Sequence, residues 1–253
     1  MEKDSSYILE YSNDHETAVR REMLEQFKKC PIPENQLLSN LGLFLNSKNL
    51  GRILFMNHIY QQIVDVPGIV VEFGTRWGQN MSLFAALRGI YEPFHRHRKI
   101  VGFDTFTGFP SLNERDGNSV MMNVGELTTT ENYEQYLDKI ISLQEQDNPL
   151  GHIKKYEVRK GDAVKEIDKY LEENPQTIIA LAYFDFDIYE PTLKCLNKIK
   201  DRVVKGSVIG FDELNDPDSP GETLALMEAF GGMNSIRLKR LPYVARTSYF
   251  VVE

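Results

Sequence analysis

Residues 68–78 read Gly-Ile-Val-Val-Glu-Phe-Gly-Thr-Arg-Trp-Gly and decide the fold of this chain. The β-branched residues at 69–71 are typical of a buried strand. The strand stops at Glu72 and runs into a turn punctuated by Gly74 and Gly78, and residues 79–88 then have the pattern of a helix. A strand, a Gly-rich turn and a helix form the first half of a βαβ unit that can hold a nucleotide-like ligand.

The same alternation continues along the chain. Residues 177–184 form the most hydrophobic segment, which predicts a central strand covered on both faces. Further strands are predicted at 99–104, 156–158 and 207–211, helices at 50–64, 163–173, 192–199 and 223–230, and an antiparallel terminal pair at 236–240 and 248–252. This pattern predicts an α/β fold with a mostly parallel sheet.

Two segments lie outside this alternation. Residues 1–49 precede the predicted domain of residues 50–253 and carry helical patterns at 16–29 and 35–45. We expect this segment to be a cap, a lid or a dimer surface. Residues 112–150 are polar and contain a predicted helix within 131–143. A connection of this length predicts a lid-like excursion over the carboxyl edge of the sheet.

The composition and charge of the chain argue against some kinds of binding partner. The 253 residues carry a net charge of −8, which argues against a surface that coats nucleic acid. The basic cluster at 95–99 is predicted to be a solvated loop. The two cysteines, Cys30 and Cys195, have no metal-finger spacing. The polar N-terminus and the lack of any apolar run near ~18 residues predict a cytoplasmic protein without a membrane span.

Acidic residues close most of the predicted strands. Because the carboxyl ends of parallel strands line one edge of a sheet, we expect these acids to gather where ligands bind. A single such acid often only caps the following helix, but several beside a Gly-rich turn need another explanation. The acids are Glu72, Asp104, Asp185 and Asp212, with Asp162 just after a fifth strand.

The first of these acids bears on the cofactor. Loops that bind phosphate offer bare N–H groups and avoid acids, whereas Glu72 stands directly before the Gly74 turn. A carboxylate there suits a ligand with an ammonium group, such as S-adenosylmethionine (SAM), better than the pyrophosphate of NAD. Asp104 is placed to accept hydrogen bonds from ribose hydroxyls.

The later acids form a second group. Asp185, Asp212 and Glu213 close two consecutive strands and have the oxygen ligands that Mg²⁺ prefers. Such a cation would lower the pKa of a substrate hydroxyl and orient it. The alternative, which the residues leave open, is that Asp187 and Glu213 cap helices while Asp185 pairs with a base.

Three stretches resemble the macrocin O-methyltransferase family of class I SAM-dependent methyltransferases. They are residues 71–78 (Val-Glu-Phe-Gly-Thr-Arg-Trp-Gly), 102–110 (Gly-Phe-Asp-Thr-Phe-Thr-Gly-Phe-Pro) and 185–192 (Asp-Phe-Asp-Ile-Tyr-Glu-Pro-Thr). The resemblance covers residues 50–230. It implies a Rossmann-like fold with a seven-stranded sheet and metal-dependent methylation of sugar hydroxyls.

The resemblance also implies roles for individual residues. The methionine end of SAM would be lined by Glu72, Gly74, Thr75 and Gly78, the ribose would be held by Asp104 near Phe106, and the adenine would be read by Asp162 beside Ala163. Asp185, Asp212 and Glu213 would bind Mg²⁺ or a similar cation, with Asp185 also the general base.

This chain departs from the family pattern at two places. It has Asp212-Glu213 where Asp-Asp is common, and Gly78-Gln79-Asn80 where Gly-Gly-Ser is common. Both departures bear on the acceptor, which we expect to be a sugar or nucleotide-activated sugar of polysaccharide or natural-product assembly. Another small polar acceptor, such as a phosphate-like group on a glycan precursor, is the first alternative, and an NAD-dependent oxidoreductase is a weaker one. Homo-oligomerisation is left open.

Overall fold

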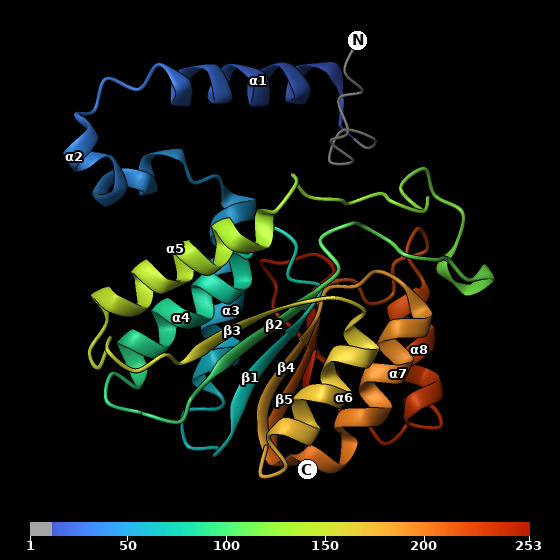
Figure 1. Ribbon diagram of the computed structural model, residues 1–253. Helices are drawn as coiled ribbons and strands as arrows, with labels where there is room; N and C mark the ends of the chain where they lie inside the picture. Colours follow the sequence, from blue (N-terminus) through green and yellow to red (C-terminus); the bar gives the residue numbers. More distant parts are fainter. Residues whose placement is uncertain (1–11) are drawn as a thin grey trace. The chain divides into compact units, whose positions relative to one another are not determined.

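The computed structural model describes residues 12–253, which fall into two compact units that meet in the sequence at Leu50 and Gly51 (Figure 1). The first unit holds helix α1 (Asp14–Lys28), the short helix α2 (Glu34–Leu37) and the 3₁₀ helix η2 (Leu38–Phe44). Helix α3 (Ser47–Gln61) begins just before the boundary and runs into the second unit.

The described residues of the N-terminal unit, from 12 on, contain α1, α2 and η2. Asn13 and Glu16 form a reciprocal capping box at the start of α1, with bonds of 2.9 and 3.0 Å. The second predicted helix is broken, because Asn40 leaves helical geometry within η2. The rings of Phe27 and Phe44 meet edge to face at 4.9 Å. The role of this unit as a cap, lid or dimer surface stays a prediction.

The second unit is built on a seven-stranded sheet with the order β3-β2-β1-β4-β5-β7-β6. Strands β1 to β5 run parallel, while β7 lies antiparallel to both β5 and β6. The strands are β1 (Ile69–Phe73), β2 (Ile100–Asp104), β3 (Tyr156–Lys160), β4 (Ile179–Phe184), β5 (Val203–Phe211), β6 (Lys239–Arg240) and β7 (Ser248–Val251). The prediction of a Rossmann-like, mostly parallel sheet with an antiparallel terminal pair is confirmed.

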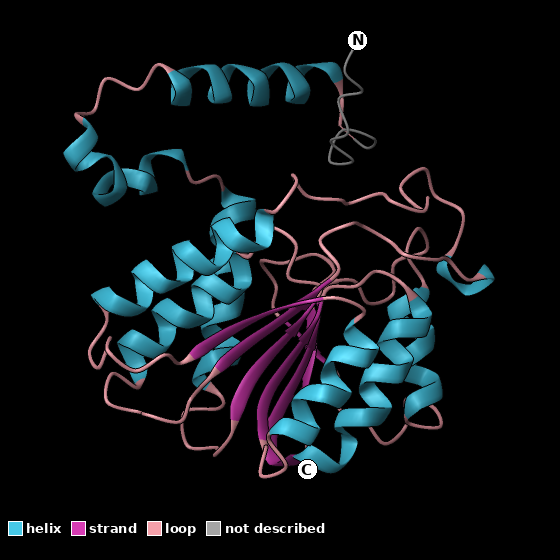
Figure 2. Cartoon of the chain, in the orientation of Figure 1, coloured by secondary structure: helices cyan, strands magenta, loops and turns pink. Residues whose placement is uncertain are grey.

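Helices cover both faces of this sheet (Figure 2). One layer contains α3, α4 (Gln79–Tyr91) and α5 (Tyr133–Asp147), and the other contains α6 (Ala163–Glu173), α7 (Tyr189–Ile199) and α8 (Gly221–Ala229). Strand β1 serves both layers, because Val70 joins the α4 core whereas Val71 and Phe73 join the α6–α7 core. The period of two places Glu72 on the same face as Val70.

The predicted excursion at 112–150 has two different halves. Its second half is α5, which lies beside α4 in Figure 1 and buries Leu137 and Ile141 in the core. Its first half contains the short helix η3 (Glu114–Asp116), where buried Asp116 accepts the N–H of Tyr189 at 2.6 Å and so caps α7. The excursion is therefore anchored at both ends, and a lid role stays a prediction.

The prediction of a solvated loop at 95–99 is wrong for Arg98. Its side chain is completely buried, where it pairs with Glu92 at 2.9 Å and donates to the carbonyl oxygens of Ile63 and Gly68. A guanidinium has five donors and can satisfy several acceptors at once. Arg98 thereby fixes the segment that leads into β1.

No helix within residues 12–253 combines the length and hydrophobicity needed to cross a bilayer.

Candidate active site

The predicted acids lie along one edge of the sheet, in the order of the strands that carry them. The last ladder bonds establish this edge, since the N–H groups of Gly74, Asp185 and Asp212 each bond to the final residues of the neighbouring strand, at 2.8 to 2.9 Å. From β3 to β5 the acids are Asp162, Asp104, Glu72, Asp185 and Asp212. The edge thus has one half on β3, β2 and β1 and another on β4 and β5.

The two turn glycines are required by close packing. Gly74 has φ +91°, and a Cβ there would lie 2.0 Å from the carbonyl oxygen of Asp185. Gly78 precedes α4 with φ +75°, and a Cβ would lie 2.2 Å from Leu137 Cδ1. Only glycine adopts such positive φ freely. The turn is therefore pressed against the end of β4, next to Asp185.

Glu72 is a buried carboxylate whose burial is only partly offset by the nearby side chains of Asn80, Arg52 and Thr75. Its side chain has no exposed surface, and neither carboxylate oxygen makes a hydrogen bond of normal geometry. Burial, followed by the charge of Asp185, raises the pKa of Glu72 well above its usual value. An ammonium group would supply the missing charge and donors, so the residue fits the amino group of SAM.

The Asp104 carboxylate accepts hydrogen bonds from one backbone N–H that follows β1 and from one that follows β2. Its Oδ2 accepts the N–H of Arg76 at 2.7 Å, and its Oδ1 accepts the N–H of Phe106 at 2.5 Å. Burial raises the pKa of Asp104. Each carboxylate oxygen has a second lone pair, so a ribose hydroxyl can still bond there. The Phe106 ring is buried in the α4 core, with φ +59° at its backbone.

The remaining predicted cofactor residues have local roles in this structure. Asp162 is exposed and caps α6, accepting the N–H of Val164 at 3.0 Å, while Ala163 is buried behind it. Thr75 is buried, and its side chain lies beside the Glu72 carboxylate, where it favours the charged form. Their contacts with SAM remain predictions.

An arginine lies between the acids of β4 and β5. Arg52 of α3 donates to Asp185 Oδ2 at 2.7 Å and contacts Asp212 Oδ1 at 3.0 Å. The hydroxyl of Tyr183 donates to the same Asp212 oxygen at 2.7 Å. Burial, followed by repulsion from Asp212, raises the pKa of Asp185 to about 7. Its side chain is nevertheless 23% exposed, so a substrate can reach it.

Glu213 pairs with a different arginine. Its Oε1 pairs with Arg246 at 2.6 Å, and its buried carboxylate also lies beside the side chain of Ser219. As placed in residues 12–253, no three acidic, histidine or cysteine side chains form a metal cage. The three predicted ligands therefore fit a hard cation in type and charge, but Arg52 pairs with two of them. In this structure Asp185 therefore pairs with a base, Arg52, as the alternative interpretation of the sequence has it.

Five side chains of the site were not predicted as site residues: Arg52, Asn80, Tyr183, Glu222 and Arg246. Arg52 was read only as part of a helix, and Glu222 lies at the start of α8, one residue outside the predicted helix. Asn80 donates to Asp185 Oδ2 at 3.3 Å and accepts from Arg52 Nε at 3.0 Å. The departure from Gly-Gly-Ser at Asn80 was the one sequence signal that pointed to such a contact.

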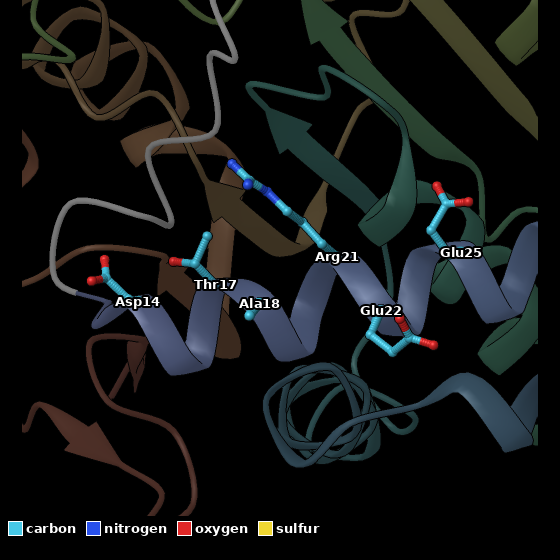
Figure 3. A pocket seen from close by; sticks show the side chains of 6 residues that line it. All are labelled: Asp14, Thr17, Ala18, Arg21, Glu22 and Glu25. Carbon is cyan, nitrogen blue, oxygen red and sulfur yellow. The ribbon is translucent and has the colours of Figure 1, made fainter.

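A pocket also lies along α1 in the N-terminal unit. Figure 3 shows its lining side chains, which all come from this one helix: Asp14, Thr17, Ala18, Arg21, Glu22 and Glu25. It contains none of the predicted site residues, all of which belong to the second unit.

Comparison with known proteins identifies the family. No family model matches the sequence, and no curated protein sequence matches it. Among solved structures, CalS11, a calicheamicin methyltransferase, superposes with a TM-score of 0.92 at 39% identity, over 95% of this chain and 94% of that one. This chain belongs to the macrocin O-methyltransferase family. It is a class I SAM-dependent O-methyltransferase.

Two further structures agree with this family assignment. The apo structure of CalS11, described as a TDP-rhamnose 3'-O-methyltransferase of calicheamicin biosynthesis, has a TM-score of 0.83 and 36% identity, and covers 95% of this chain and 96% of its own. The O-methyltransferase NovP, at 16% identity and a TM-score of 0.55 over 80% and 79% of the two chains, shares the fold. Membership of a SAM-dependent family removes the NAD-dependent alternative.

Proposed function

We propose that this methyltransferase acts on a hydroxyl of a sugar or nucleotide-activated sugar in polysaccharide or natural-product biosynthesis. The proposal is supported by CalS11, which is described as acting on TDP-rhamnose and is 36% identical over 95% of this chain. It is also supported by the acids on β4 and β5, which suit activation of a hydroxyl rather than a thiol or an aromatic carbon.

The observation that carries this proposal is the position of Asp185. Its carbonyl oxygen contacts the Gly74 turn, and its carboxyl group, with a pKa of about 7, is partly exposed. A general base works best when its pKa is close to the operating pH. Asp185 would take the hydroxyl proton while the oxygen attacks the sulfonium methyl, the carbon–sulfur bond breaks and S-adenosylhomocysteine leaves.

The cofactor would lie across the other half of the edge. In this proposal the ammonium of SAM pairs with Glu72, the turn at Gly74, Thr75 and Gly78 follows the methionine chain, and Asp104 beside Phe106 holds the ribose. The adenine would lie toward Asp162 and Ala163. The buried carboxylate of Glu72, whose oxygens make no hydrogen bond of normal geometry, is the strongest support for this orientation.

We further propose that Asp185, Asp212 and Glu213 hold Mg²⁺ or a similar divalent cation. Support comes from the buried Glu213 carboxylate, whose burial Arg246 and Ser219 only partly offset, and from mutual repulsion, since Asp212 raises the pKa of Asp185. When bound, the cation would act as a Lewis acid on the acceptor oxygen. Arg52 and Arg246 hold these same carboxylates and would have to give up bonds to it.

A phosphate-like group on a glycan precursor is the alternative acceptor. An anionic acceptor would need a cation at the mouth of the site, and the half-exposed guanidinium of Arg246 is within reach of Glu213 and Asp216. Because Glu213 and Asp216 already neutralise the charge of Arg246, we favour a hydroxyl acceptor over a phosphate-like one. We leave the oligomeric state open.

A screen of SAM consumption tests the proposal. Purified enzyme is incubated with SAM and a panel of dTDP- and UDP-sugars, free sugars and sugar phosphates, with Mg²⁺ or with EDTA. We expect turnover of at least one nucleotide sugar, lost in EDTA and restored by Mg²⁺. Turnover of sugar phosphates with the methyl group on phosphate would support the alternative. Full activity in EDTA-treated enzyme would exclude the proposed cation.

A further inference from the structure

We propose that Glu222 is a positioning residue of the methyl-transfer site, holding the two acid-bearing segments in one arrangement. The segments are residues 185–187, after β4, and residues 212–213, after β5. This inference rests on the proposed roles of Asp185 and Asp212. Glu222 lies in the first turn of α8 and contacts the backbone of these segments rather than the substrate.

The two oxygens of Glu222 divide their bonds between the segments. Oε1 accepts the N–H of Phe186 at 2.9 Å and that of Asp187 at 3.3 Å, while Oε2 accepts the N–H of Glu213 at 3.3 Å. The side chain is completely buried. A single carboxylate therefore connects two strand ends that are neighbours in the sheet but distant in sequence.

The bonded N–H groups are those that the sheet itself no longer satisfies. Asp185 and Asp212 make the last ladder bonds of β4 and β5, to Phe73 and Phe184. The N–H groups that follow have no partner in the sheet, and a buried N–H without an acceptor is destabilising. Burial, followed by the charge of Asp187, raises the pKa of Glu222, whereas the three N–H donors favour its ionised form. An ionised carboxylate has acceptors only, so it serves both segments; a Gln amide in the same place would turn an N–H₂ donor toward one of them.

The start of α8 is fitted closely against the first segment. A Cβ at Gly221 would lie 2.6 Å from the nitrogen of Tyr189 and 2.7 Å from the carbonyl oxygen of Asp187, so a larger residue would push α8 away. Asp187 itself has φ +63°, a conformation that non-glycine residues keep only where their surroundings impose it. Glu222 and Gly221 supply those surroundings and thereby set where Asp185 and Asp187 lie.

Glu222→Gln tests the proposal, because it keeps the size of the side chain and changes one acceptor into a donor. Gly221→Ala is the second variant, since it disturbs the same contact while leaving the carboxylate in place. Glu145→Gln is the matched control. Glu145 is also buried, but it belongs to α5 and pairs with Arg88 of α4 and with Lys155, away from the acid-bearing segments. Asp185→Asn reports on the proposed function itself.

Three measurements separate positioning from folding. Hydrogen exchange by mass spectrometry follows peptides that cover residues 183–189 and 211–216; calorimetry gives the Kd for SAM; and steady-state kinetics give kcat with dTDP-rhamnose, or with the nucleotide sugar that wild type turns over fastest. For Glu222→Gln and Gly221→Ala we expect exchange at least ~10-fold faster in both segments together, an unchanged Kd for SAM and a kcat about 10- to 100-fold lower, since small displacements have such effects.

The control variant Glu145→Gln should have a lower Tm than wild type but the same kcat per folded enzyme. The inference is overturned if exchange in either segment is unchanged in Glu222→Gln, if exchange rises throughout the unit, or if kcat stays at the wild-type value while Asp185→Asn is inactive. Full activity of Asp185→Asn would instead reject the proposed function, whatever Glu222→Gln does.

Discussion

Arg52 and Asp185 form an ion pair of 2.7 Å although 133 positions separate them in the chain. The same guanidinium reaches Asp212 at 3.0 Å, so one positive charge lies between the acids of two neighbouring strands. Charged groups at this distance attract strongly when water is partly excluded. The ion pair fastens α3 to the end of the sheet where the proposed reaction takes place, and it competes directly with a metal ion for the same two carboxylates.

Arg52→Met should make the protein depend on a divalent cation for stability. Removing the guanidinium leaves Asp185 and Asp212 facing each other, which we expect to cost about 1–3 kcal/mol of unfolding free energy near pH 8. Mg²⁺ or Mn²⁺ would then replace the missing charge, so the cation should raise Tm more in this variant than in wild type. Thermal melts with each cation and with EDTA measure this difference.

Lys198→Met is the control for that experiment, because Lys198 pairs with Asp168 at 2.6 Å on the opposite helical layer. Its Tm should respond to cations as wild type does. An equal cation effect in Arg52→Met and wild type would mean that Arg52 and the cation do not share these carboxylates.

Asp185→Asn should nearly abolish methyl transfer while leaving SAM binding intact. The amide keeps the shape of the side chain but cannot take a proton, and loss of a general base lowers rates by about 10²- to 10⁴-fold. The proposed SAM contacts lie at the ends of β1, β2 and β3, so the Kd for SAM should change little. Single-turnover kinetics and calorimetry measure the two quantities separately, and wild-type rates in the variant would rule out Asp185 as the base.

The stability of the cofactor-free protein should fall as the pH rises. Burial raises the pKa of Asp185 from 3.8 to about 7, so the folded protein binds this proton more tightly than the unfolded chain does. The stabilisation that results is complete below about pH 3.8 and is lost as the pH rises through 7. Burial also raises the pKa of Asp187 and of Glu213, which act in the same direction.

The measurement is a set of urea titrations between pH 5.5 and 8.5, without and with SAM plus Mg²⁺. We expect unfolding free energy to decline across this range in the free protein, and the decline to be smaller with both ligands, since each supplies positive charge to the carboxylates. A rise in stability with pH in the free protein would contradict the proton uptake inferred for these acids.

Local sequence patterns predicted the sheet well because each strand carries its own signal. The β-branched run before Glu72 and the apolar segment at 179–184 need no distant partner to be recognised. Arg98 was misread because charge density within five residues says nothing of the carbonyl groups that close around it. Arg52 and Glu222 were missed because their partners lie on other elements, and no periodicity records a contact between elements.

Glu72→Gln should raise the stability of the protein and weaken its binding of SAM. Burial of the Glu72 carboxylate is only partly offset by Asn80, Arg52 and Thr75, so its charge weakens the fold, and the neutral amide should raise the stability of the cofactor-free protein at pH 8 by about 1–3 kcal/mol. The amide cannot pair with an ammonium group, and loss of a charged hydrogen bond should weaken SAM binding about 10- to 100-fold. Stabilisation at the expense of activity is common at functional sites.

Glu145→Gln is the comparison that makes this result specific. Both carboxylates are buried, but Glu145 has Arg88 and Lys155 as partners, so its amide variant leaves two cations unpaired and should lose about 3–5 kcal/mol. Chemical denaturation at pH 8 and calorimetry with SAM are applied to both variants. Opposite changes in stability, with weaker SAM binding only in Glu72→Gln, would mean that Glu72 is kept for the cofactor. A loss of stability in both variants would assign Glu72 to the fold instead.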